Sequence, residues 1–198
     1  MKFNIFETKL GLYQNEDKDF HEQITKETEA YEKKEGRVIS NIGGFQSQDI
    51  KIEGVFERFI EQLILPNFKA YLQDDYLFTK AELRLDNMWA NINYQYSTNI
   101  QHCHPHTDFA FVYYCRCEEN SGNLVLNHPN PTQGYVEFFS RCWGNKPSPA
   151  NTILYSLPQE EGRLVFFPAN LMHSVEQNLN EKPRISIAGN LSVIVLDQ

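Results

Sequence analysis

The spacing of apolar residues changes once along the chain, near residue 80. Between residues 52 and 72 they recur every three or four positions, which is the period of a helix with one buried side. Beyond residue 80 apolar and polar residues alternate, as in strands that have one face in a core. We therefore expect a single domain, residues 1–198, with a mainly helical N-terminal extension, residues 1–80, and a strand-rich core, residues 81–198.

Two helices are predicted in the extension. Residues 15–36 are strongly charged and offer only a thin apolar stripe, so we expect a solvent-exposed helix there. A second, strongly amphipathic helix begins near Ile52, and Pro66 should interrupt it because proline lacks the amide hydrogen that a helix interior requires. Between the two, the glycines and polar residues of residues 40–47 predict a loop.

The core is predicted to consist of many short strands separated by Gly, Pro and Asn turns. This pattern is typical of a sandwich or jelly roll, on which the preceding helices can pack from outside. We therefore expect an α+β fold. The predicted strands are residues 81–86, 89–94, 109–116, 123–126, 135–139, 152–155, 163–167, 173–176 and 184–195.

Charge and cysteine content narrow the function classes. The chain has 26 Asp and Glu against 18 Lys and Arg residues, for a formal net charge of -8, so we expect no broad nucleic-acid-binding face. No apolar run is long enough to span a membrane, and the N-terminus lacks the layout of a secretory signal. These features predict a cytoplasmic protein with no membrane partner, whose four cysteines are free thiols.

Four side chains that can bind metal crowd into one short stretch before a predicted strand. His102, His104, His106 and Asp108 fall within seven residues. Packing alone does not explain why so many of these side chains lie together. Imidazole is the commonest metal ligand in proteins, so a metal site is the better explanation. Residues two apart in an extended segment project from one face, so two of these side chains can bind one ion together.

A single distant histidine, His173, is the expected partner of this cluster. It follows a glycine turn, an aromatic strand and a proline-containing bend. In a jelly roll its strand can lie beside the one that ends at His102, which brings the imidazoles together in the barrel mouth. Three protein ligands on one face leave coordination positions open for a substrate or O₂.

Arg184 and Ser186 share one face of the last predicted strand with Ala188 and Asn190. An arginine that faces the interior of a barrel requires an anion, and a guanidinium with a neighbouring hydroxyl suits a carboxylate. We therefore expect a small dicarboxylate to bridge the metal and Arg184. The alternative interpretation is a solvated or salt-bridged arginine.

These motifs resemble the iron(II)- and 2-oxoglutarate-dependent oxygenases, whose fold is the double-stranded β-helix, a jelly-roll, cupin-like barrel. That family has His-x-Asp or His-x-Glu, then a distant His, then Arg-x-Ser, and the second half is matched by His173, Arg184 and Ser186. More narrowly, the chain resembles an uncharacterised subgroup of 2-oxoglutarate oxygenases found in bacteria and phages. The matching stretches are residues 40–47, 89–93, 102–105, 112–114, 166–173 and 184–190.

The resemblance leaves three ligand sets open, because the first half of the motif departs from the family pattern. We favour His102 and His104 with His173, a neutral three-His site, since a short loop then separates these ligands from the next strand. The second set replaces the first two residues by His106 and Asp108. The third resembles cupins and adds Asp108 as a fourth ligand beside His102 and His104.

The resemblance also implies the chemistry. Fe(II) and 2-oxoglutarate would be the cofactors, and an Fe(II)- and 2-oxoglutarate-dependent dioxygenase would use O₂ to hydroxylate an unidentified small molecule or peptide. Arg184 and Ser186 would hold the far carboxylate, while Asn190, Asn91 and Tyr94 would line the cofactor site. Competing hypotheses are a cupin-like metalloenzyme that does not use 2-oxoglutarate and a non-catalytic barrel module, for example in a phage particle. A homodimer is compatible with the sequence.

Overall fold

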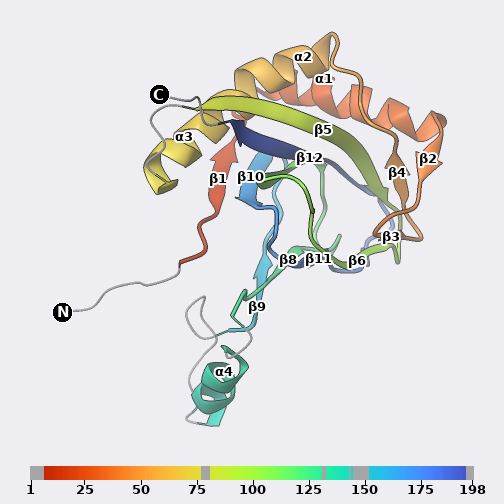
Figure 1. Ribbon diagram of the computed structural model, residues 1–198. Helices are drawn as coiled ribbons and strands as arrows, with labels where there is room; N and C mark the ends of the chain where they lie inside the picture. Colours follow the sequence, from red (N-terminus) through yellow and green to blue (C-terminus); the bar gives the residue numbers. More distant parts are fainter. Residues whose placement is uncertain (1–6, 77–80, 131–132, 143, 145–151, 195–198) are drawn as a thin grey trace.

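The computed structural model describes residues 7–76, 81–130, 133–142, 144 and 152–194. Two sheets of antiparallel strands face each other (Figure 1). Three helices cover the outer side of the larger sheet (Figure 1), namely α1 (Lys18–Glu29), α2 (Val55–Phe59) and α3 (Leu65–Tyr76). The arrangement confirms the predicted α+β class, in which N-terminal helices pack outside a jelly roll.

The larger sheet has seven strands in the order β1-β10-β7-β12-β5-β4-β2. Its central strand, β12, pairs with β5 on one side and β7 on the other. Three strands from the predicted helical extension, β1, β2 and β4, complete its edges. The bounds are β1 (Gly11–Gln14), β10 (Arg163–Pro168), β7 (Phe109–Arg116), β12 (Arg184–Ile194), β5 (Glu82–Asn93), β4 (Phe45–Ser47) and β2 (Gly36–Arg37).

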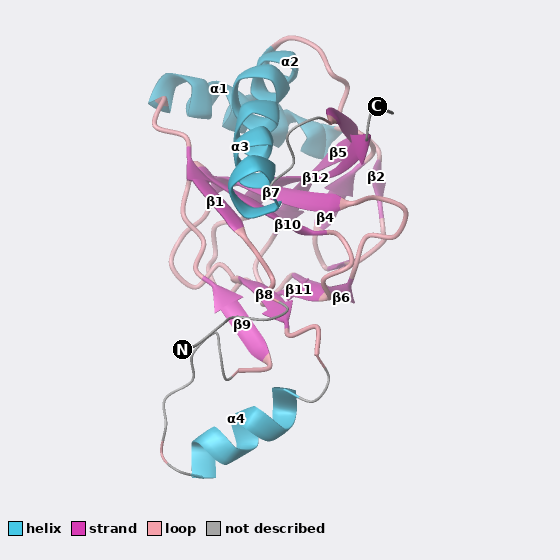
Figure 2. Ribbon diagram, turned by 60° about the vertical axis from the view of Figure 1, so that its left-hand side comes forward, coloured by secondary structure: helices cyan, strands magenta, loops and turns pink. Residues whose placement is uncertain are grey.

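The smaller sheet has five strands in the order β3-β6-β11-β8-β9. Figure 2 shows this sheet beneath the larger one, with the helix α4 (Gln133–Cys142) beyond β9 and away from both sheets. Its inner face is therefore turned toward the larger sheet. The bounds are β3 (Asn41–Ile42), β6 (Thr98–His102), β11 (His173–Val175), β8 (Leu124–Asn127) and β9 (Leu154–Leu157).

Aromatic side chains join the helices to the larger sheet. The ring of Phe68 on α3 has its centroid 5.4 Å from that of Phe166 and 5.3 Å from that of Phe109. On α2, Phe59 lies 5.1 Å from Tyr113. All five side chains are buried, and full burial of such a side chain stabilises a fold by about 1.5–3 kcal/mol. The outer face of the sheet is thus occupied by packing, which leaves its inner face for a site.

Contrary to the prediction, Pro66 does not interrupt the second helix. A π-helical turn, Ile60–Ile64, joins α2 to α3, and Pro66 is the second residue of α3. A π-turn shifts the hydrogen-bonding register, so the chain can place proline where its ring does not strike a carbonyl and its missing amide hydrogen is not needed. The helical path therefore continues through all three segments.

One strand prediction is wrong, two predicted strands are one strand, and one predicted loop contains strands. Residues 135–139 belong to α4, because their apolar residues also fit the three- and four-residue spacing of a helix. Residues 81–86 and 89–94 belong to the single long strand β5. Residues 40–47 contribute β3 and β4, whereas the strand predicted at residues 109–116 is confirmed as β7.

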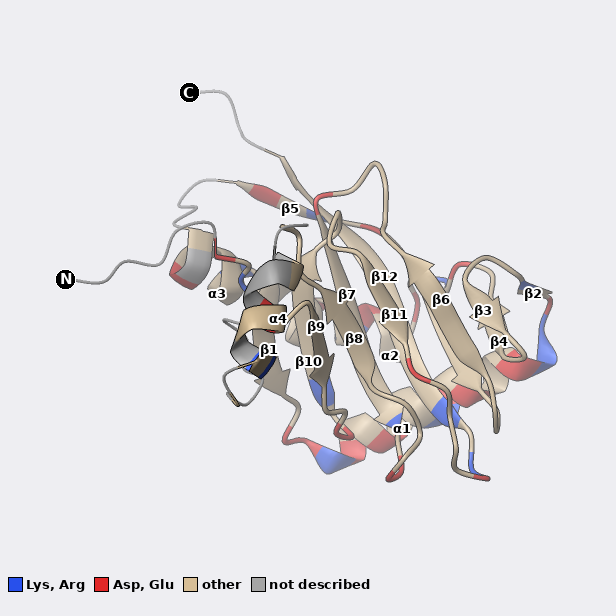
Figure 3. Ribbon diagram, turned by 90° about the horizontal axis from the view of Figure 1, so that it is seen from below, with Lys and Arg blue, Asp and Glu red and all other residues tan. Residues whose placement is uncertain are grey.

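Charged side chains gather on the outer helices. Figure 3 shows Asp, Glu, Lys and Arg along α1, while the strands of the smaller sheet carry few of them. The Asp17 side chain accepts a hydrogen bond of 3.0 Å from the Phe20 amide and caps this helix. The charged run is therefore a solvated helix face, as predicted. Each helix in the described part of the chain is too short or too polar to cross a membrane.

Candidate metal centre between the two sheets

Three histidines meet between the sheets. His102 ends β6, His173 begins β11, and His104 follows the end of β6 by two residues. One ligand atom from each side chain lies within 4.8 Å of the other two. Ring centroids are 4.3 Å apart for His102 and His173 and 5.0 Å apart for His104 and His173. Such a cluster can supply three ligands to one metal ion.

A β-bulge in β6 turns His102 toward this cluster. His102 pairs with His173 and Asn99 pairs with Val175, so a three-residue step on β6 faces a two-residue step on β11. The extra residue of a bulge turns the following side chain to the other face. Asn99 and His102 therefore line the same cavity, although simple alternation puts them on opposite faces. Ile100, within the bulge, is exposed.

Each imidazole is oriented by an oxygen acceptor at Nδ1. The backbone carbonyl two residues earlier lies 2.7 Å from Nδ1 of His102 and 2.8 Å from Nδ1 of His173. The side-chain oxygen of Asn190 lies 2.6 Å from Nδ1 of His104. Carbonyl oxygens only accept hydrogen bonds, so Nδ1 carries the proton in all three rings. Each Nε2 then keeps its lone pair, which is the form that binds a metal ion.

Burial keeps the three rings uncharged. Loss of hydration, with a smaller contribution from the neighbouring His102, lowers the pKa of His173 to about 3. Burial also lowers the pKa of His102 and of His104 below the ordinary histidine value. Because a metal ion binds neutral imidazole, the cluster need not release protons to bind one at neutral pH.

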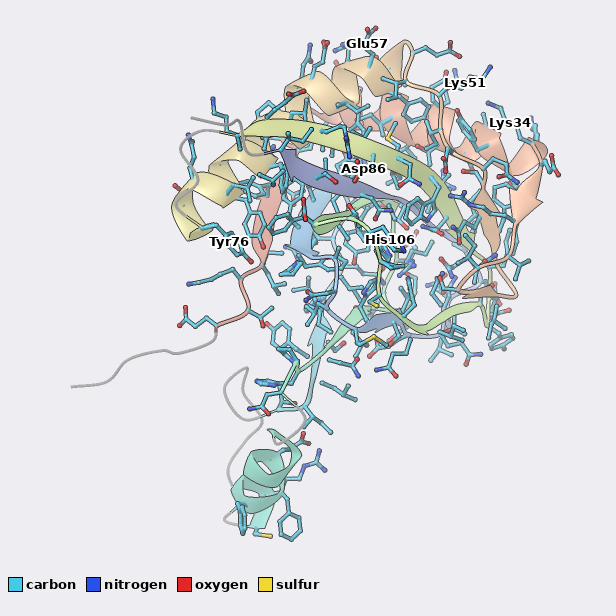
Figure 4. The ribbon with its side chains drawn as sticks, viewed as in Figure 1. Lys34, Lys51, Glu57, Tyr76, Asp86 and His106 are labelled. Carbon is cyan, nitrogen blue, oxygen red and sulfur yellow. The ribbon has the colours of Figure 1, made fainter. Side chains whose placement is uncertain are left out.

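His106 and Asp108 do not join the cluster. Both lie in the loop between β6 and β7, where His106 (labelled in Figure 4) has a positive φ of 68°. A carboxylate oxygen of Asp108 accepts a hydrogen bond of 2.8 Å from the amide of Val193. Among the described residues, the three histidines are the group of His, Cys, Asp and Glu side chains close enough to hold a metal ion. The geometry favours the three-His set over both alternatives.

The cluster adjoins a cavity whose wall is the inner face of the larger sheet. Neighbouring strands place residues of β5, β12 and β7 side by side in two rows, which are Asn91, Ser186 and Tyr114 in one and Trp89, Ala188 and Val112 in the other. Inward-facing residues of the opposite sheet and of the segment before β3 close the other side, and they include Ser40, Asn99, Leu124 and Val175.

Arg184 lines this cavity, buried and with unused hydrogen-bonding capacity. Its guanidinium donates to the carbonyl of Gly122 and to the side-chain oxygen of Asn93, both at 3.0 Å. Its Nε, the hydroxyl of Tyr114 and the side-chain oxygen of Asn91 are buried without partners in the described part of the chain. Burial lowers the pKa of Arg184. Unpaired donors beside a buried cation suit an anionic ligand.

Two residues predicted to contact the cofactor lie elsewhere. Tyr94 is 38% exposed, and its hydroxyl donates a hydrogen bond of 2.6 Å to the carboxylate of Glu32. This residue follows the end of β5 and lies three positions after Asn91, so strand alternation places it on the face opposite the cavity. Asn190 does not line the cavity but holds His104, and its amide nitrogen donates to the side-chain oxygen of Asn87 at 2.9 Å. The prediction that both contact the cofactor is not supported by these positions.

The sequence reasoning missed three polar residues of the cavity, which are Tyr114, Asn99 and Ser40. Tyr114 could have been found, because it lies two positions after Val112 on one strand and so shares its face. Ser40 has no such signal, because its contact with Asn99 joins segments 59 residues apart.

A larger groove of about 540 Å³ lies outside the sheets, beside α1. Its walls carry charges of both signs, and two of them, Glu29 and Arg116, already form an ion pair at 2.9 Å. None of the described metal-ligating clusters lies in this groove. The smaller cavity beside the histidines is therefore the candidate site, despite its size.

Comparisons with known proteins agree with this geometry. Residues 87–190 match the family model described as "Putative 2OG-Fe(II) oxygenase". The matched segment includes all three histidines, Arg184 and Ser186. A search of curated proteins gave no match.

Solved structures share the fold at low sequence identity. The α-ketoglutarate-dependent non-heme epimerase SnoN from nogalamycin biosynthesis is 16% identical, with a TM-score of 0.64 over 92% of this chain and 78% of that one. HygX from Streptomyces hygroscopicus, solved with nickel and 2-oxoglutarate, is 13% identical, with a TM-score of 0.64 over 93% and 83%. A prolyl-4-hydroxylase from Pseudomonas putida is 11% identical, with a TM-score of 0.63 over 92% of each chain.

Proposed function

This chain belongs to the family of 2OG-Fe(II) oxygenases, and we propose that it is an Fe(II)- and 2-oxoglutarate-dependent dioxygenase that hydroxylates a small molecule or peptide. The observation that carries the proposal is the shared cavity of Arg184 and the three histidines. One cavity can therefore hold a metal ion, bound by histidines of the smaller sheet and the loop after it, next to an anion bound by Arg184 of the larger sheet.

The residues present fit a metal ion. Three neutral imidazoles offer lone pairs on Nε2, and each ring is fixed by a hydrogen bond at Nδ1. His102, His104 and His173 would hold Fe(II). Imidazole suits iron, although a set without a carboxylate carries no negative charge and should bind Fe(II) less tightly than the usual one. When bound, iron and 2-oxoglutarate would supply the oxidising power for attack on a C–H bond by O₂.

The residues also fit 2-oxoglutarate. The unpaired Nε of Arg184 and hydroxyl of Tyr114 can donate to a carboxylate, and Ser186 lies beside Tyr114 in the same row. A buried cation without an acidic partner costs several kcal/mol, and a bound carboxylate would offset much of that cost. Arg184, Tyr114 and Ser186 would orient the cofactor, while Trp89, Val112 and Leu124 would exclude water.

We further propose that residues 1–198 form one domain, because strands from the first 80 residues belong to both sheets. A cytoplasmic location and a homodimer stay predictions. The same holds for the reaction, since the similar structures include an epimerase as well as a hydroxylase.

An anaerobic titration tests the proposed function. Fe(II) and then 2-oxoglutarate are added to the metal-free protein, and the visible metal-to-ligand charge-transfer band is recorded. We expect the band in the wild type and its loss in His102→Ala. Metal binding without the band at saturating 2-oxoglutarate would refute the proposal and indicate a cupin-like metalloenzyme. Absence of metal binding in the wild type would also refute it and indicate a non-catalytic module.

A further inference from the structure

A continuous line of polar side chains joins Arg184 to Ser40, and three of its four members line the cavity. The guanidinium donates to the side-chain oxygen of Asn93 at 3.0 Å, and the amide nitrogen of Asn93 donates to the side-chain oxygen of Asn99 at 3.0 Å. The amide nitrogen of Asn99 then donates to the hydroxyl oxygen of Ser40 at 3.1 Å. All four side chains are buried. We call this line the Arg184–Ser40 relay.

The direction of every hydrogen bond in the relay follows from its first member. Arginine has no acceptor atom, so the oxygen of the Asn93 amide must face it and the nitrogen must point away, toward Asn99. The same reasoning orients Asn99 with its nitrogen toward Ser40. Ser40 therefore receives a hydrogen bond, and its own proton must point elsewhere. Among the described residues no acceptor takes that proton.

The backbone around Ser40 is fixed in place. The amide of Ile100 donates to the carbonyl of Ser40 at 2.9 Å. The next residue, Asn41, donates from its side chain to the carbonyl of Gly44 at 3.0 Å and accepts from the amide of Ile39 at 3.0 Å. A hydroxyl held this way loses little conformational entropy when it binds a ligand. Residues 40–47, for which the sequence patterns predict only a loop, thus position a donor at the cavity.

The position of the relay between Arg184 and the histidines decides which part of a ligand Ser40 can contact. Asn93 pairs with Arg184 across β5 and β12, and Asn99 lies three residues before His102 on β6. The relay thus begins at the Arg184 end of the cavity and reaches β6 before the first histidine. In the proposed function, that end receives the carboxylate of 2-oxoglutarate farther from the metal.

We propose that Ser40 is a cofactor-binding residue, whose hydroxyl donates a hydrogen bond to the distal carboxylate of 2-oxoglutarate and so selects a dicarboxylate over a monocarboxylate. The inference rests on the proposed function. Asn93 and Asn99 are positioning residues in it, because they set the direction of the Ser40 proton without touching the ligand themselves.

The test compares two keto acids in anaerobic Fe(II) titrations read from the charge-transfer band and from tryptophan fluorescence, to which the cavity residue Trp89 contributes. Ser40→Ala should weaken 2-oxoglutarate binding about tenfold, the usual effect of one lost hydrogen bond to a charged group. Binding of 2-oxopentanoate, which lacks the distal carboxylate, should not change. Ser40→Thr keeps the hydroxyl and should bind 2-oxoglutarate nearly as the wild type does.

A second variant tests the direction of the relay. Asn99→Asp replaces the nitrogen that faces Ser40 by an oxygen, so the Ser40 proton should turn to the introduced carboxylate and leave the ligand. The loss of 2-oxoglutarate affinity caused by Asn99→Asp should then be larger in the wild-type background than in Ser40→Ala, where only charge repulsion remains.

The outcomes separate the two proposals. Unchanged 2-oxoglutarate affinity in Ser40→Ala, or an equal loss for both keto acids, would overturn the role of Ser40 and leave the proposed function standing. No 2-oxoglutarate binding by the wild type would overturn both.

Discussion

Gly189 on β12 has no room for a side chain. A Cβ atom at this position would lie 2.4 Å and 2.6 Å from two ring carbons of Phe111 and 2.8 Å from the backbone oxygen of Asn87. The Phe111 ring cannot retreat, because it is fully buried between the sheet and the helices, and the Asn87 oxygen belongs to the neighbouring strand. Gly189→Ala must therefore move backbone beside Asn190, the residue that orients His104.

The cost can be worked from these contacts. Overpacking a rigid core costs about 1–3 kcal/mol, and two separate obstacles place Gly189→Ala near the upper end of that range. Restriction of the unfolded chain by the added methyl group offsets about 0.4–1 kcal/mol. The net loss in free energy of unfolding should be about 2 kcal/mol, which corresponds to a fall in Tm of about 4–8 °C for a protein of this size.

Urea unfolding of the metal-free protein, followed by circular dichroism, measures this loss. Gly134→Ala is the matched control, since its nearest neighbouring atom would lie 3.8 Å away and α4 should gain up to about 1 kcal/mol in helix propensity. Phe111→Leu removes the obstructing ring carbons, so Gly189→Ala should cost at least about 1 kcal/mol less in that background. Wild-type stability of Gly189→Ala, or equal costs in both backgrounds, would refute the reasoning.

Three further predictions concern the cavity and its supports. Arg184→Met should weaken 2-oxoglutarate binding at least about 30-fold in spectral titrations, because losing one partner of a buried charge pair costs about 2 kcal/mol or more; binding within about threefold of wild type would contradict its role. Tyr114→Phe removes a buried hydroxyl without a partner in the described chain, so urea unfolding of the metal-free protein should change by less than about 0.5 kcal/mol while 2-oxoglutarate affinity falls; a larger loss of stability would show that the hydroxyl is already satisfied. Burial alone would raise the pKa of Asp86 (Figure 4), but hydrogen bonds from Ser192 and Thr107 hold it below its ordinary value. Because the folded-state pKa is the lower one, the carboxylate stabilises the fold above the ordinary carboxyl pKa and stops doing so as pH falls through the folded value. Asp86→Asn should thus cost about 1 kcal/mol at pH 7 and progressively less as pH falls below the ordinary carboxyl pKa, and urea titrations that show a constant cost would exclude this linkage.

The periodicity of apolar residues predicted those helices and strands whose two faces pack against clearly different surroundings. β7 was found residue for residue because its odd positions, such as Phe111, pack on the helices while Val112 and Tyr114 face the cavity. α4 was mistaken for a strand because its apolar residues satisfy both periods, and no sequence signal decides between them.

The candidate site could be predicted only where the spacing of residues along a strand determines the face to which their side chains point. Two-residue spacing correctly grouped His102 with His104, and the position of His173 opposite His102 follows from a jelly roll. The bulge that brings Asn99 to the same cavity depends on pairing with β11, so periodicity within β6 cannot reveal it. Tyr94 shows the opposite limit, since the family resemblance implies a cofactor contact that alternation from Asn91 along β5 does not support.

The position of β12 has a consequence for how the protein folds. It is the last strand of the described chain, yet it separates β5 from β7, which have no pairing with each other. During synthesis, β5 and β7 each have an unpaired edge until residues 184–194 have left the ribosome. Unpaired strand edges can form hydrogen bonds with strands of other chains. Arg184 and its partner Asn93, 91 residues apart, also meet only then. The centre that would bind metal and cofactor is thus assembled in the final step of folding, and slow completion of that step exposes the newly made chain to aggregation.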